Sequence, residues 1–325
     1  MSPEINYQEA FTLAIKLSEQ IDYQSLTHDF LYSLEKFSFV SHAAAYEIYG
    51  ERRQRTGQAS CASEQLIRRF PLDLTDEEPN EAFDLLEEIN TVIGFKPSKP
   101  NAAGLFTQIL ASIRDVSGPD RVVLIQGEFD NDALELISSV IALYRNQVAL
   151  HDNKERDLLT KLPNRQTFDA RILQVCEHFR LRPLVDRVLD KSSWIAMADI
   201  DHFKQVNDTY GHQCGDEVLL VFSRLLEKYF RYNDFLFRFG GEEFVIILNL
   251  VAEADALATF ERFRKAIADY QFETVGKITV SIGVAHIYAS SVPTILLDRA
   301  DKALYYGKTN GRNQLNLYEN LYEEC

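Results

Sequence analysis

The segment Phe239-Gly240-Gly241-Glu242-Glu243-Phe244 indicates how the C-terminal half of the chain folds. It connects two apolar runs, 235–239 and 242–248, that are typical of neighbouring strands. Two glycines between such runs predict a tight β-hairpin whose turn requires positive φ. The hairpin carries Glu242 and Glu243 beside its tip, where adjacent carboxylates repel each other unless cations or hydrogen-bond donors lie between them. Taken alone, such a pair is most often a solvated surface feature.

A third acid follows another predicted strand, the apolar run 193–198, which ends in Asp199-Ile200-Asp201. If this strand neighbours the hairpin, the carboxylates of Asp199, Glu242 and Glu243 converge at one edge of the sheet. Oxygen ligands of this kind suit Mg²⁺ or Mn²⁺. Two such ions can clamp a phosphate, activate an attacking hydroxyl and stabilise the leaving group.

The rest of the C-terminal half alternates between helical and strand patterns. Helices are predicted at 217–230, 254–270 and 294–306, and a further strand at 277–285. The resulting order, βααββαβ, predicts an α+β sandwich.

The N-terminal part, residues 1–133, also mixes both patterns. Apolar spacing predicts helices at 9–20 and 26–37, strands at 43–48 and 121–125, and loops at 73–79 and 96–100.

Residues 134–158 form a predicted linker helix. Six apolar residues recur at alternating three- and four-residue steps, and His151 and Glu155 occupy the two remaining places; the six are Leu134, Ile137, Ile141, Tyr144, Val148 and Leu158. This spacing favours a coiled coil between two copies of the chain. The alternative is a single helix that packs on its own domain.

The composition is that of a globular protein of about two domains, with 325 residues, 46% hydrophobic and 26% charged. No apolar run approaches the ~20 residues that cross a bilayer, and the first residues lack the apolar core of a cleaved signal. The four cysteines (Cys61, Cys176, Cys214 and Cys325) are scattered. We therefore expect a cytoplasmic protein with reduced thiols.

The net charge of −15 argues against a nucleic acid as partner, because phosphate contacts need clustered Lys and Arg. Residues 1–152 hold 24 acidic and 12 basic side chains, so most of the excess lies in the N-terminal half. A phosphorylated small molecule is therefore better placed in the C-terminal half.

The acidic hairpin resembles the signature of the GGDEF family of diguanylate cyclases, in its Gly-Gly-Glu-Glu-Phe variant. Further motifs occur in family order: Asp157-Leu-Leu-Thr160 with Leu162-Pro-Asn-Arg165, Asp199-Ile-Asp-His-Phe203-Lys204, Asn207-Asp-Thr-Tyr-Gly-His212, Gly215-Asp216, and Lys308-Thr-Asn-Gly-Arg312-Asn313. The departures are Lys161, where the family usually has Gly, and a slightly long spacing between Arg165 and Asp199. The resemblance implies that 159–325 is a GGDEF domain of the nucleotidyl-cyclase, palm-like type, with a central antiparallel sheet flanked by helices.

The resemblance also implies a reaction in which two GTP molecules condense to cyclic di-GMP and two pyrophosphates. Each domain holds one GTP, so a homodimer is required and two-fold symmetry brings the sites face to face. Family members that have lost catalytic acids act instead as receptors for GTP or cyclic di-GMP. This is the alternative function, and a dimerising adaptor is a third; the acids retained here favour the enzyme.

By the same resemblance, Asp199, the main-chain carbonyl of Ile200, Glu242 and Glu243 hold two Mg²⁺ or Mn²⁺ ions. Glu242 accepts the proton of the 3′-hydroxyl, and Glu243 can join it as a catalytic residue. A solvated turn residue is the alternative for Glu242.

The substrate-binding residues implied by the family come from two runs and the hairpin. Asn207 and Asp216 read the guanine edge, with helix capping as the alternative, and Asp216 favours GTP over ATP. Phe203, Lys204 and His212 lie near the substrate, with core packing of Phe203 and a structural His212 as alternatives. Lys308 and Arg312 bind the triphosphate unless they are merely solvated cations, and Gly240 and Gly241 let the backbone approach the nucleotide.

Arg231 and Asp234 have the spacing of the family's inhibitory product site, Arg-x-x-Asp. Arg can hold phosphate and stack on guanine, while Asp accepts from the guanine edge. We therefore expect feedback by cyclic di-GMP; a salt bridge at a helix end is the alternative.

Residues 1–133 weakly resemble a GAF sensor domain, with a PAS-like domain as the nearest alternative and no diagnostic motif. We expect a small-molecule or protein signal that the sequence does not name. His28, His42 and Cys61 lack the spacing of metal or haem ligands and are expected to be structural.

Overall fold

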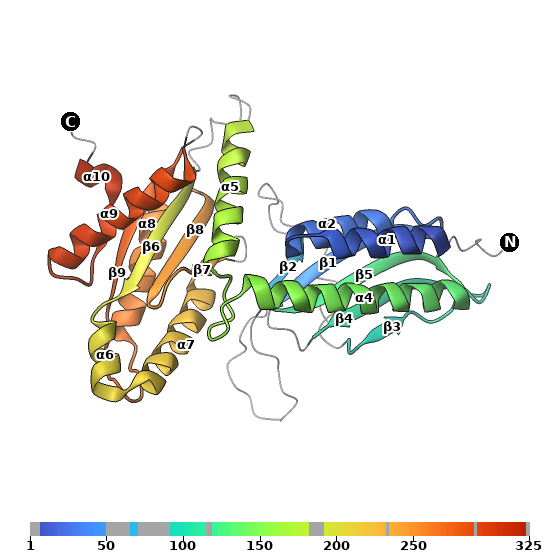
Figure 1. Ribbon diagram of the computed structural model, residues 1–325, viewed down its shortest axis with the longest axis horizontal. Coiled ribbons are helices and arrows are strands. Elements are labelled where there is room, and N and C mark those ends of the chain that lie inside the picture. Colours follow the sequence, from blue (N-terminus) through green and yellow to red (C-terminus); the bar gives the residue numbers. More distant parts are fainter. Residues whose placement is uncertain are drawn as a thin grey trace. The chain divides into compact units, whose positions relative to one another are not determined.

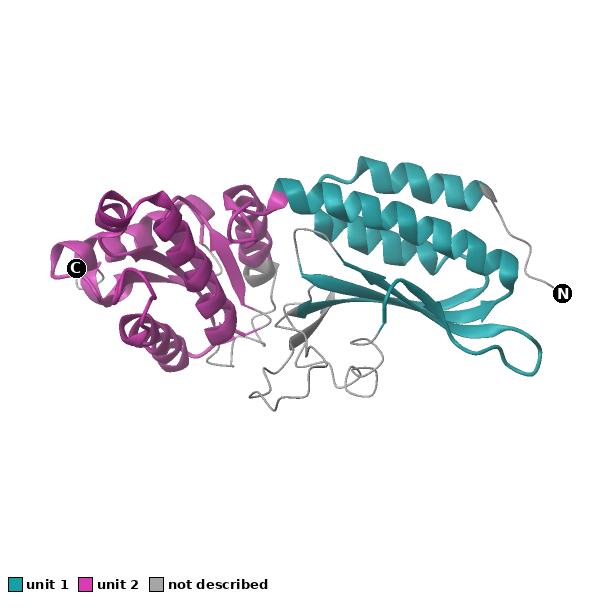
Figure 2. Cartoon of the chain, turned by 90° about the horizontal axis from the view of Figure 1, so that it is seen from below, with its two compact units in different colours: residues 1–154 teal, residues 155–325 magenta. Residues whose placement is uncertain are grey.

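The structure is a computed structural model that describes residues 7–49, 66–70, 92–114, 119–181, 192–231, 234–288 and 291–322. The chain divides into two compact units, residues 1–154 and 155–325 (Figure 2). Over the described ranges, each unit is built around a five-stranded sheet. None of the helices in these ranges combines the length and apolarity that a membrane span requires.

Unit 1 is an antiparallel sheet with helices at both ends of its chain (Figure 1). The sheet order is β2-β1-β5-β4-β3, and every neighbouring pair is antiparallel. The elements are α1 (Tyr7–Glu19), α2 (Tyr23–Leu34), β1 (Val40–Tyr49), β2 (Leu66–Phe70), β3 (Phe95–Pro97), β4 (Phe106–Ile113), β5 (Asp120–Phe129) and α4 (Asn131–Glu155).

Most elements expected in unit 1 are present, and one expectation is wrong. The helices expected at 9–20 and 26–37 correspond to α1 and α2, and the strands expected at 43–48 and 121–125 lie within β1 and β5. Residues 96–100 are not entirely a loop, because β3 pairs with β4 through Lys96 and Pro97. The loop expected at 73–79, like Cys61, lies outside the described residues.

Helix α4 corrects the prediction of a coiled-coil seam. Four of the six apolar residues of the predicted coiled coil are at most 7% exposed. They pack in the core of unit 1 with α1, α2 and one face of the sheet, and they are Ile137, Ile141, Tyr144 and Val148. Tyr144 also stacks on Phe30 at 3.9 Å and hydrogen-bonds Thr27 at 2.7 Å. These positions are therefore unavailable to a partner helix, and the alternative, a helix that packs on its own domain, is observed. Three- and four-residue spacing fits a helix that faces a sheet as well as one that faces another helix.

A buried ion pair fixes the last turns of α4 to the sheet. Arg121 on β5 donates from both terminal nitrogens to Asp152 at 2.7 and 2.8 Å, and its Nε lies 3.4 Å from Glu47 on β1. The guanidinium also lies over the ring of Tyr23 at 4.1 Å. Removing one partner of a buried pair leaves an uncompensated charge, so this contact anchors the end of α4 firmly within unit 1.

Unit 2 has the expected α+β architecture, with helices on both faces of a mainly antiparallel sheet (Figure 1). The order is β10-β9-β6-β8-β7, and only the β10–β9 pair is parallel. The elements are α5 (Arg165–Leu181), β6 (Ser192–Ile200), α6 (Phe203–Tyr210), α7 (His212–Tyr229), β7 (Phe235–Arg238), β8 (Glu243–Val251), α8 (Glu253–Asp269), β9 (Val280–Ile287), α9 (Pro293–Thr309), β10 (Leu315–Leu317) and α10 (Tyr318–Tyr322).

The alternation of side chains along β6 assigns Asp199 to one face of this sheet. Ala196, Ala198 and Ile200 point into the core formed with α7 and α8. Asp199 therefore points to the other face, on which α9 packs. Gly283 on β9 makes that packing close, because a Cβ there would clash with the backbone of α9. This contact brings the C-terminal part of α9 into reach of Asp199.

Candidate active site

The hairpin forms as expected, but the conformation of its glycines differs from the one predicted. β7 and β8 pair antiparallel, and the N–H groups of Phe239 and Gly240 both donate to the carbonyl of Glu243, at 2.8 and 3.1 Å. Neither Gly240 nor Gly241 adopts positive φ, so that expectation is wrong. At Gly240 a Cβ would instead clash with Oε2 of Glu243. The glycine therefore makes room for the carboxylate beside it.

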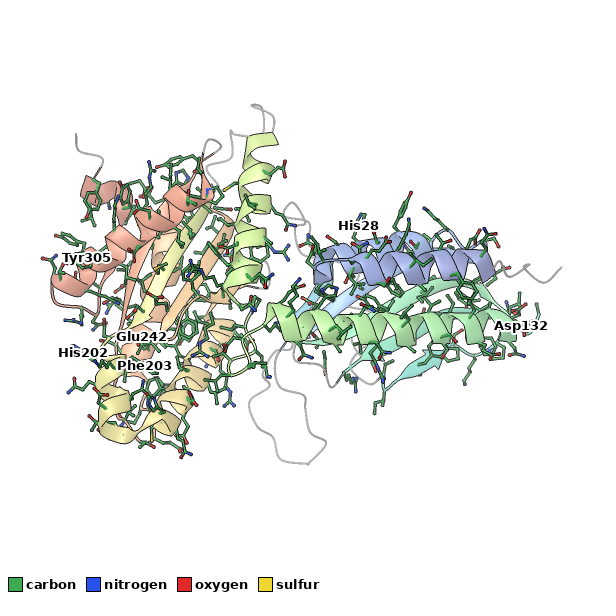
Figure 3. All side chains as sticks on the ribbon, viewed as in Figure 1. His28, Asp132, His202, Phe203, Glu242 and Tyr305 are labelled. Atoms are coloured by element: carbon green, nitrogen blue, oxygen red, sulfur yellow. The ribbon has the colours of Figure 1, made fainter. Side chains whose placement is uncertain are left out.

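The structure brings the three expected acids to one edge of the sheet. Asp199, at the end of β6, lies opposite Glu243 of β8, and the next N–H, that of Ile200, donates to the carbonyl of Glu242 at 3.4 Å. Asp199 is 3% exposed, whereas both glutamates are half-buried. Figure 3 labels Glu242 with His202 and Phe203 around this end of β6.

Burial and the neighbouring carboxylates raise the pKa of two of these acids. Burial raises the pKa of Asp199 to about 6; Lys308, whose Nζ lies 2.7 Å from Asp199 Oδ2, opposes this rise, and Glu242 and Glu243 add to it. Burial also raises the pKa of Glu242. The positive charge of Lys308 lowers this pKa, and the negative charge of Glu243 raises it further. A cation placed here would relieve the repulsion.

The donor set at this edge fits Mg²⁺ or Mn²⁺ in chemical type. Asp199, Glu242, Glu243 and the main-chain carbonyl of Ile200 all offer hard oxygen atoms. Within the described residues, no three His, Cys, Asp or Glu side chains are already gathered as a ligand set. Lys308 instead provides the positive charge in contact with Asp199.

Asn207 and Asp216 lie where α6 meets α7. Gly211, with φ 85°, joins the two helices and is the N-cap of α7, with no side-chain cap. Helix capping by Asn207 or Asp216, the alternative role, is therefore not observed at this N-terminus. Gly215 packs so closely that a Cβ would clash with Oδ1 of Asn207. Asn207 is half-buried, whereas Asp216, the residue after Gly215, is exposed.

The other residues of this run differ in exposure. Phe203 is 5% exposed and belongs to the core with α7, so the alternative of core packing is observed for it. Lys204 and His212 are exposed at the starts of α6 and α7. The chain turns sharply before this run, since His202 adopts a left-handed φ of 58°.

Asp201 is a buried acid to which the sequence assigned no role. Its carboxylate accepts hydrogen bonds from Ser281 Oγ at 2.7 Å, Thr279 Oγ1 at 2.6 Å and the N–H of Asn313 at 3.0 Å. It therefore joins the end of β6, the start of β9 and the loop after α9. Its place directly after the predicted strand, in Asp199-Ile200-Asp201, is the feature of the sequence that could have indicated a role near the site.

Arg238 is a second residue to which the sequence pattern assigned no role. Its guanidinium donates to Asp157 Oδ1 at 2.7 Å and to the carbonyl of Gly241 at 2.8 Å, and its own N–H donates to the carbonyl of Pro163 at 2.9 Å. Asp157 also accepts from the N–H and hydroxyl of Thr160, each at 2.8 Å. The first residues of unit 2 are thereby tied to the hairpin tip.

Arg231 and Asp234 are arranged around a turn after α7. Asp234 is 6% exposed and accepts from the N–H groups of Arg231, at 2.8 Å, and Asn249, at 3.2 Å. The side chain of Arg231 is exposed. Of the two residues, Arg231 is the one that a ligand in solution can reach.

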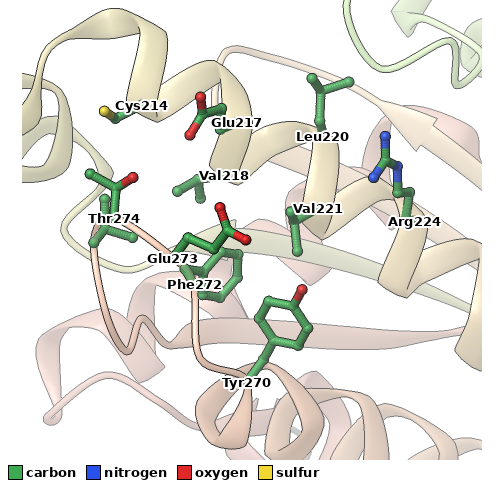
Figure 4. Close-up of a pocket in the computed structure, with 11 residues that line it drawn as sticks. Cys214, Glu217, Val218, Leu220, Val221, Arg224, Tyr270, Phe272, Glu273 and Thr274 are labelled. Atoms are coloured by element: carbon green, nitrogen blue, oxygen red, sulfur yellow. The ribbon is translucent and has the colours of Figure 1, made fainter.

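A cavity of about 330 Å³ lies between α7 and the segment 270–275 (Figure 4). Cys214, Glu217, Arg224, Tyr270 and Glu273 are among the side chains that line it. None of the expected catalytic or substrate-binding residues lines this cavity. It is therefore separate from the acidic edge.

Comparison with known proteins places the site in a family. Residues 154–314 match the family model described as "Diguanylate cyclase, GGDEF domain". Diguanylate cyclase A of Treponema denticola is 34% identical over 197 residues, which are 59% of this chain and 52% of that protein. Diguanylate cyclase DgcP of Pseudomonas aeruginosa is 38% identical over 174 residues, 52% of this chain and 25% of that protein. The chain thus spans between a quarter and about half of the length of these curated relatives.

A solved structure gives the same result for the fold. The coiled coil and GGDEF domain of DgcB from Caulobacter crescentus, in complex with c-di-GMP, superposes with a TM-score of 0.50 and is 28% identical. The match covers 56% of this chain and 95% of that one. Together with the acidic hairpin and the strand end opposite it, these matches show that the chain, through residues 154–314, belongs to the GGDEF family.

Proposed function

We propose that the chain is a diguanylate cyclase, which condenses two GTP molecules to cyclic di-GMP and two pyrophosphates. The observation that carries this proposal is the register of Asp199 opposite Glu243, which brings the metal-binding acids of the family to one edge of the sheet. The curated relatives quoted above are named diguanylate cyclases, which supports the same activity.

In the proposed reaction, the 3′-oxygen of one GTP attacks the α-phosphorus of the other. A new P–O bond forms, the bond to the β-phosphate oxygen breaks, and pyrophosphate leaves; the second GTP reacts in the same way. Mg²⁺ or Mn²⁺ held by Asp199, the Ile200 carbonyl, Glu242 and Glu243 would neutralise phosphate charge and acidify the hydroxyl. Glu242 accepts the hydroxyl proton.

The protein itself holds the substrate in line, which supplies a large part of catalysis in phosphoryl transfer. Lys308 and Arg312 bind the triphosphate, and the planar fork of Arg312 suits two phosphate oxygens at once. Asn207 and Asp216 select guanine through its edge, so GTP and not ATP is the substrate. Gly240 and Gly241 let the hairpin backbone approach the nucleotide.

The proposed enzyme works as a homodimer, because one chain supplies one GTP site and the product needs two. The buried residues of α4 take no part in that contact. Unit 1 is proposed to act as the sensor, of a type left open between GAF and PAS. Arg231 is proposed to contact cyclic di-GMP when the product inhibits the enzyme, and the cytoplasm is the proposed compartment.

The direct test is incubation of the purified full chain with GTP and Mg²⁺, followed by chromatography of the nucleotides. We expect cyclic di-GMP from the wild type, none without a divalent cation, and at least about a 100-fold lower rate from Asp199→Asn. Arg262→Met, which changes an exposed charge on α8, serves as a surface control and should keep the wild-type rate. Binding of GTP or cyclic di-GMP without turnover would favour a receptor instead.

A further inference from the structure

The loop that follows α9 holds an unusual backbone. Gly311, Arg312 and Asn313 have φ values of 114°, 61° and 50°, so three consecutive residues lie in the left-handed region. Only the first is a glycine, and residues with a Cβ persist in this region only where their surroundings hold them. The middle residue, Arg312, is the one proposed to bind the triphosphate.

One support of this loop comes from α8. Arg264 donates through Nη1 to the carbonyl of Asn313 at 3.0 Å and to its Oδ1 at 2.5 Å. The other edge of the guanidinium donates to Glu261 on the same helix, from Nε at 2.7 Å and from Nη2 at 2.6 Å. Only 14% of the Arg264 side chain is exposed. The guanidinium is therefore oriented by its own helix before it meets the loop.

A second support of the loop consists of hydrogen bonds from its backbone N–H groups. The N–H of Asn313 donates to Asp201 at 3.0 Å, and the N–H of Arg312 donates to the carbonyl of Gly307 at 2.9 Å. Asn313 is thus fixed at its N–H by Asp201 and at its carbonyl by Arg264. The backbone of Arg312 is held on both sides, while its side chain stays exposed.

From this arrangement we infer that Arg264 is a positioning residue, which holds Arg312 in place for the triphosphate by fixing Asn313. The inference rests on the proposed function, in which Arg312 binds GTP. A lysine at position 264 could not reproduce the contact, because it lacks the fork that reaches Glu261 and Asn313 together. The alternative is that Arg264 only stabilises the fold, without any effect through Arg312.

A double-mutant cycle separates these alternatives. Arg264→Met, Arg312→Met and the double variant are compared with the wild type in KM and kcat for GTP, with Arg262→Met as the control on the same helix. We expect Arg264→Met to raise KM about tenfold, because a charged hydrogen bond is lost, and to change kcat much less. In the Arg312→Met background the same substitution should raise KM less than about twofold. Arg264→Lys should recover little.

Two kinetic results would overturn the inference. One is a KM for Arg264→Met equal to that of the wild type. The other is a fold-increase in KM on Arg264→Met that is as large in the Arg312→Met background as in the wild type. A purely stabilising residue would lower the melting temperature and leave the two effects independent.

Hydrogen exchange tests the contact between Arg264 and Asn313 independently of catalysis. If the wild type makes no cyclic di-GMP, that result rejects the proposed function alone. The amide of Asn313 should exchange at least about tenfold faster in Arg264→Met than in the wild type or in Arg262→Met. Unchanged exchange at this amide would reject Arg264 as the residue that holds the loop, whatever the chain catalyses.

Discussion

Arg238 Nη1 lies 2.7 Å from Asp157 Oδ1, and the same guanidinium donates to the carbonyl of Gly241 at 2.8 Å. One side chain therefore connects the first residues of unit 2 with the tip of the acidic hairpin. Glu242, the proposed acceptor of the hydroxyl proton, is the next residue after Gly241. We therefore expect the contact that Arg238 makes with Gly241 to help position this carboxylate.

Replacing Arg238 by Met should lower the rate of cyclic di-GMP formation about 10- to 100-fold, because the hairpin tip loses its hydrogen bond from the guanidinium and, with it, the link to Asp157. The measurement is the initial rate at saturating GTP and Mg²⁺. Asp157→Asn removes only the anionic partner and leaves the bond to Gly241, so its loss should be smaller. A wild-type rate from Arg238→Met would contradict this role.

The ionised carboxylate of Asp157 should stabilise the folded protein, and this contribution should be lost in acid. Burial raises the pKa of this carboxyl, but hydrogen bonds from Thr160 and Arg238 lower it by more, so the net pKa lies below its ordinary value. A depressed pKa gives stability that is fully present above the unfolded pKa of about 4 and is lost as the pH falls through the folded pKa. The melting temperature of Asp157→Asn should therefore lie below that of the wild type at pH 7.

The difference in melting temperature between the two proteins should begin to narrow below about pH 4, where Asp157 of the unfolded chain takes up a proton, and it should close as the pH falls through the lower pKa of the folded state. Thermal melts between pH 3 and pH 7 measure it. A gap that stays constant over this range would show that the charge of Asp157 does not contribute to stability.

Gly215→Ala should weaken GTP binding, because the new methyl group would displace the Asn207 side chain against which Gly215 packs. We expect KM for GTP to rise about tenfold, the effect of losing one good hydrogen bond to the base. Cys214→Ala, at the preceding position of α7, is the control and should change KM little. If Gly215→Ala binds GTP normally, Asn207 does not read the guanine.

Arg231→Ala should relieve inhibition by cyclic di-GMP without lowering the initial rate, because Arg231 is exposed and lies outside the acidic edge. Inhibition curves with added product measure the effect, and an increase of about tenfold or more in the inhibitory concentration is expected. Asp234 is less suitable for this test, because its carboxylate holds two backbone N–H groups. Inhibition that is unchanged in Arg231→Ala would remove this site.

The sequence predicted the elements whose pattern is local. Apolar runs on either side of Gly240 and Gly241 predicted the hairpin, and the strand predicted before Asp199 pairs with it in the structure, as the convergence of the acids required. The short strand β10 was missed, because three residues carry too little periodicity to distinguish them from a loop. In the hairpin, Gly240 lies close to the Glu243 carboxylate and does not adopt positive φ, so its place in the turn did not indicate its backbone conformation.

Contacts made in the folded state could not be predicted. The spacing of Ile137, Ile141 and Tyr144 shows that one face of α4 is buried, but not whether a sheet or a second helix covers it. Similarly, nothing in the sequence pairs Arg238 with Asp157, or Arg264 with Asn313, because 81 and 49 residues separate the partners. Only the fold brings these side chains together.

The proposed cyclase activity is tested most directly by the ratio of the two products that the purified full chain releases from GTP and Mg²⁺. Pyrophosphate and cyclic di-GMP are measured in the same reaction, for the wild type and for Glu242→Ala. We expect two pyrophosphates for each cyclic di-GMP from the wild type, and neither product from Glu242→Ala. Release of GDP and phosphate in place of the cyclic dinucleotide, or a wild-type rate from Glu242→Ala, would contradict the proposed activity.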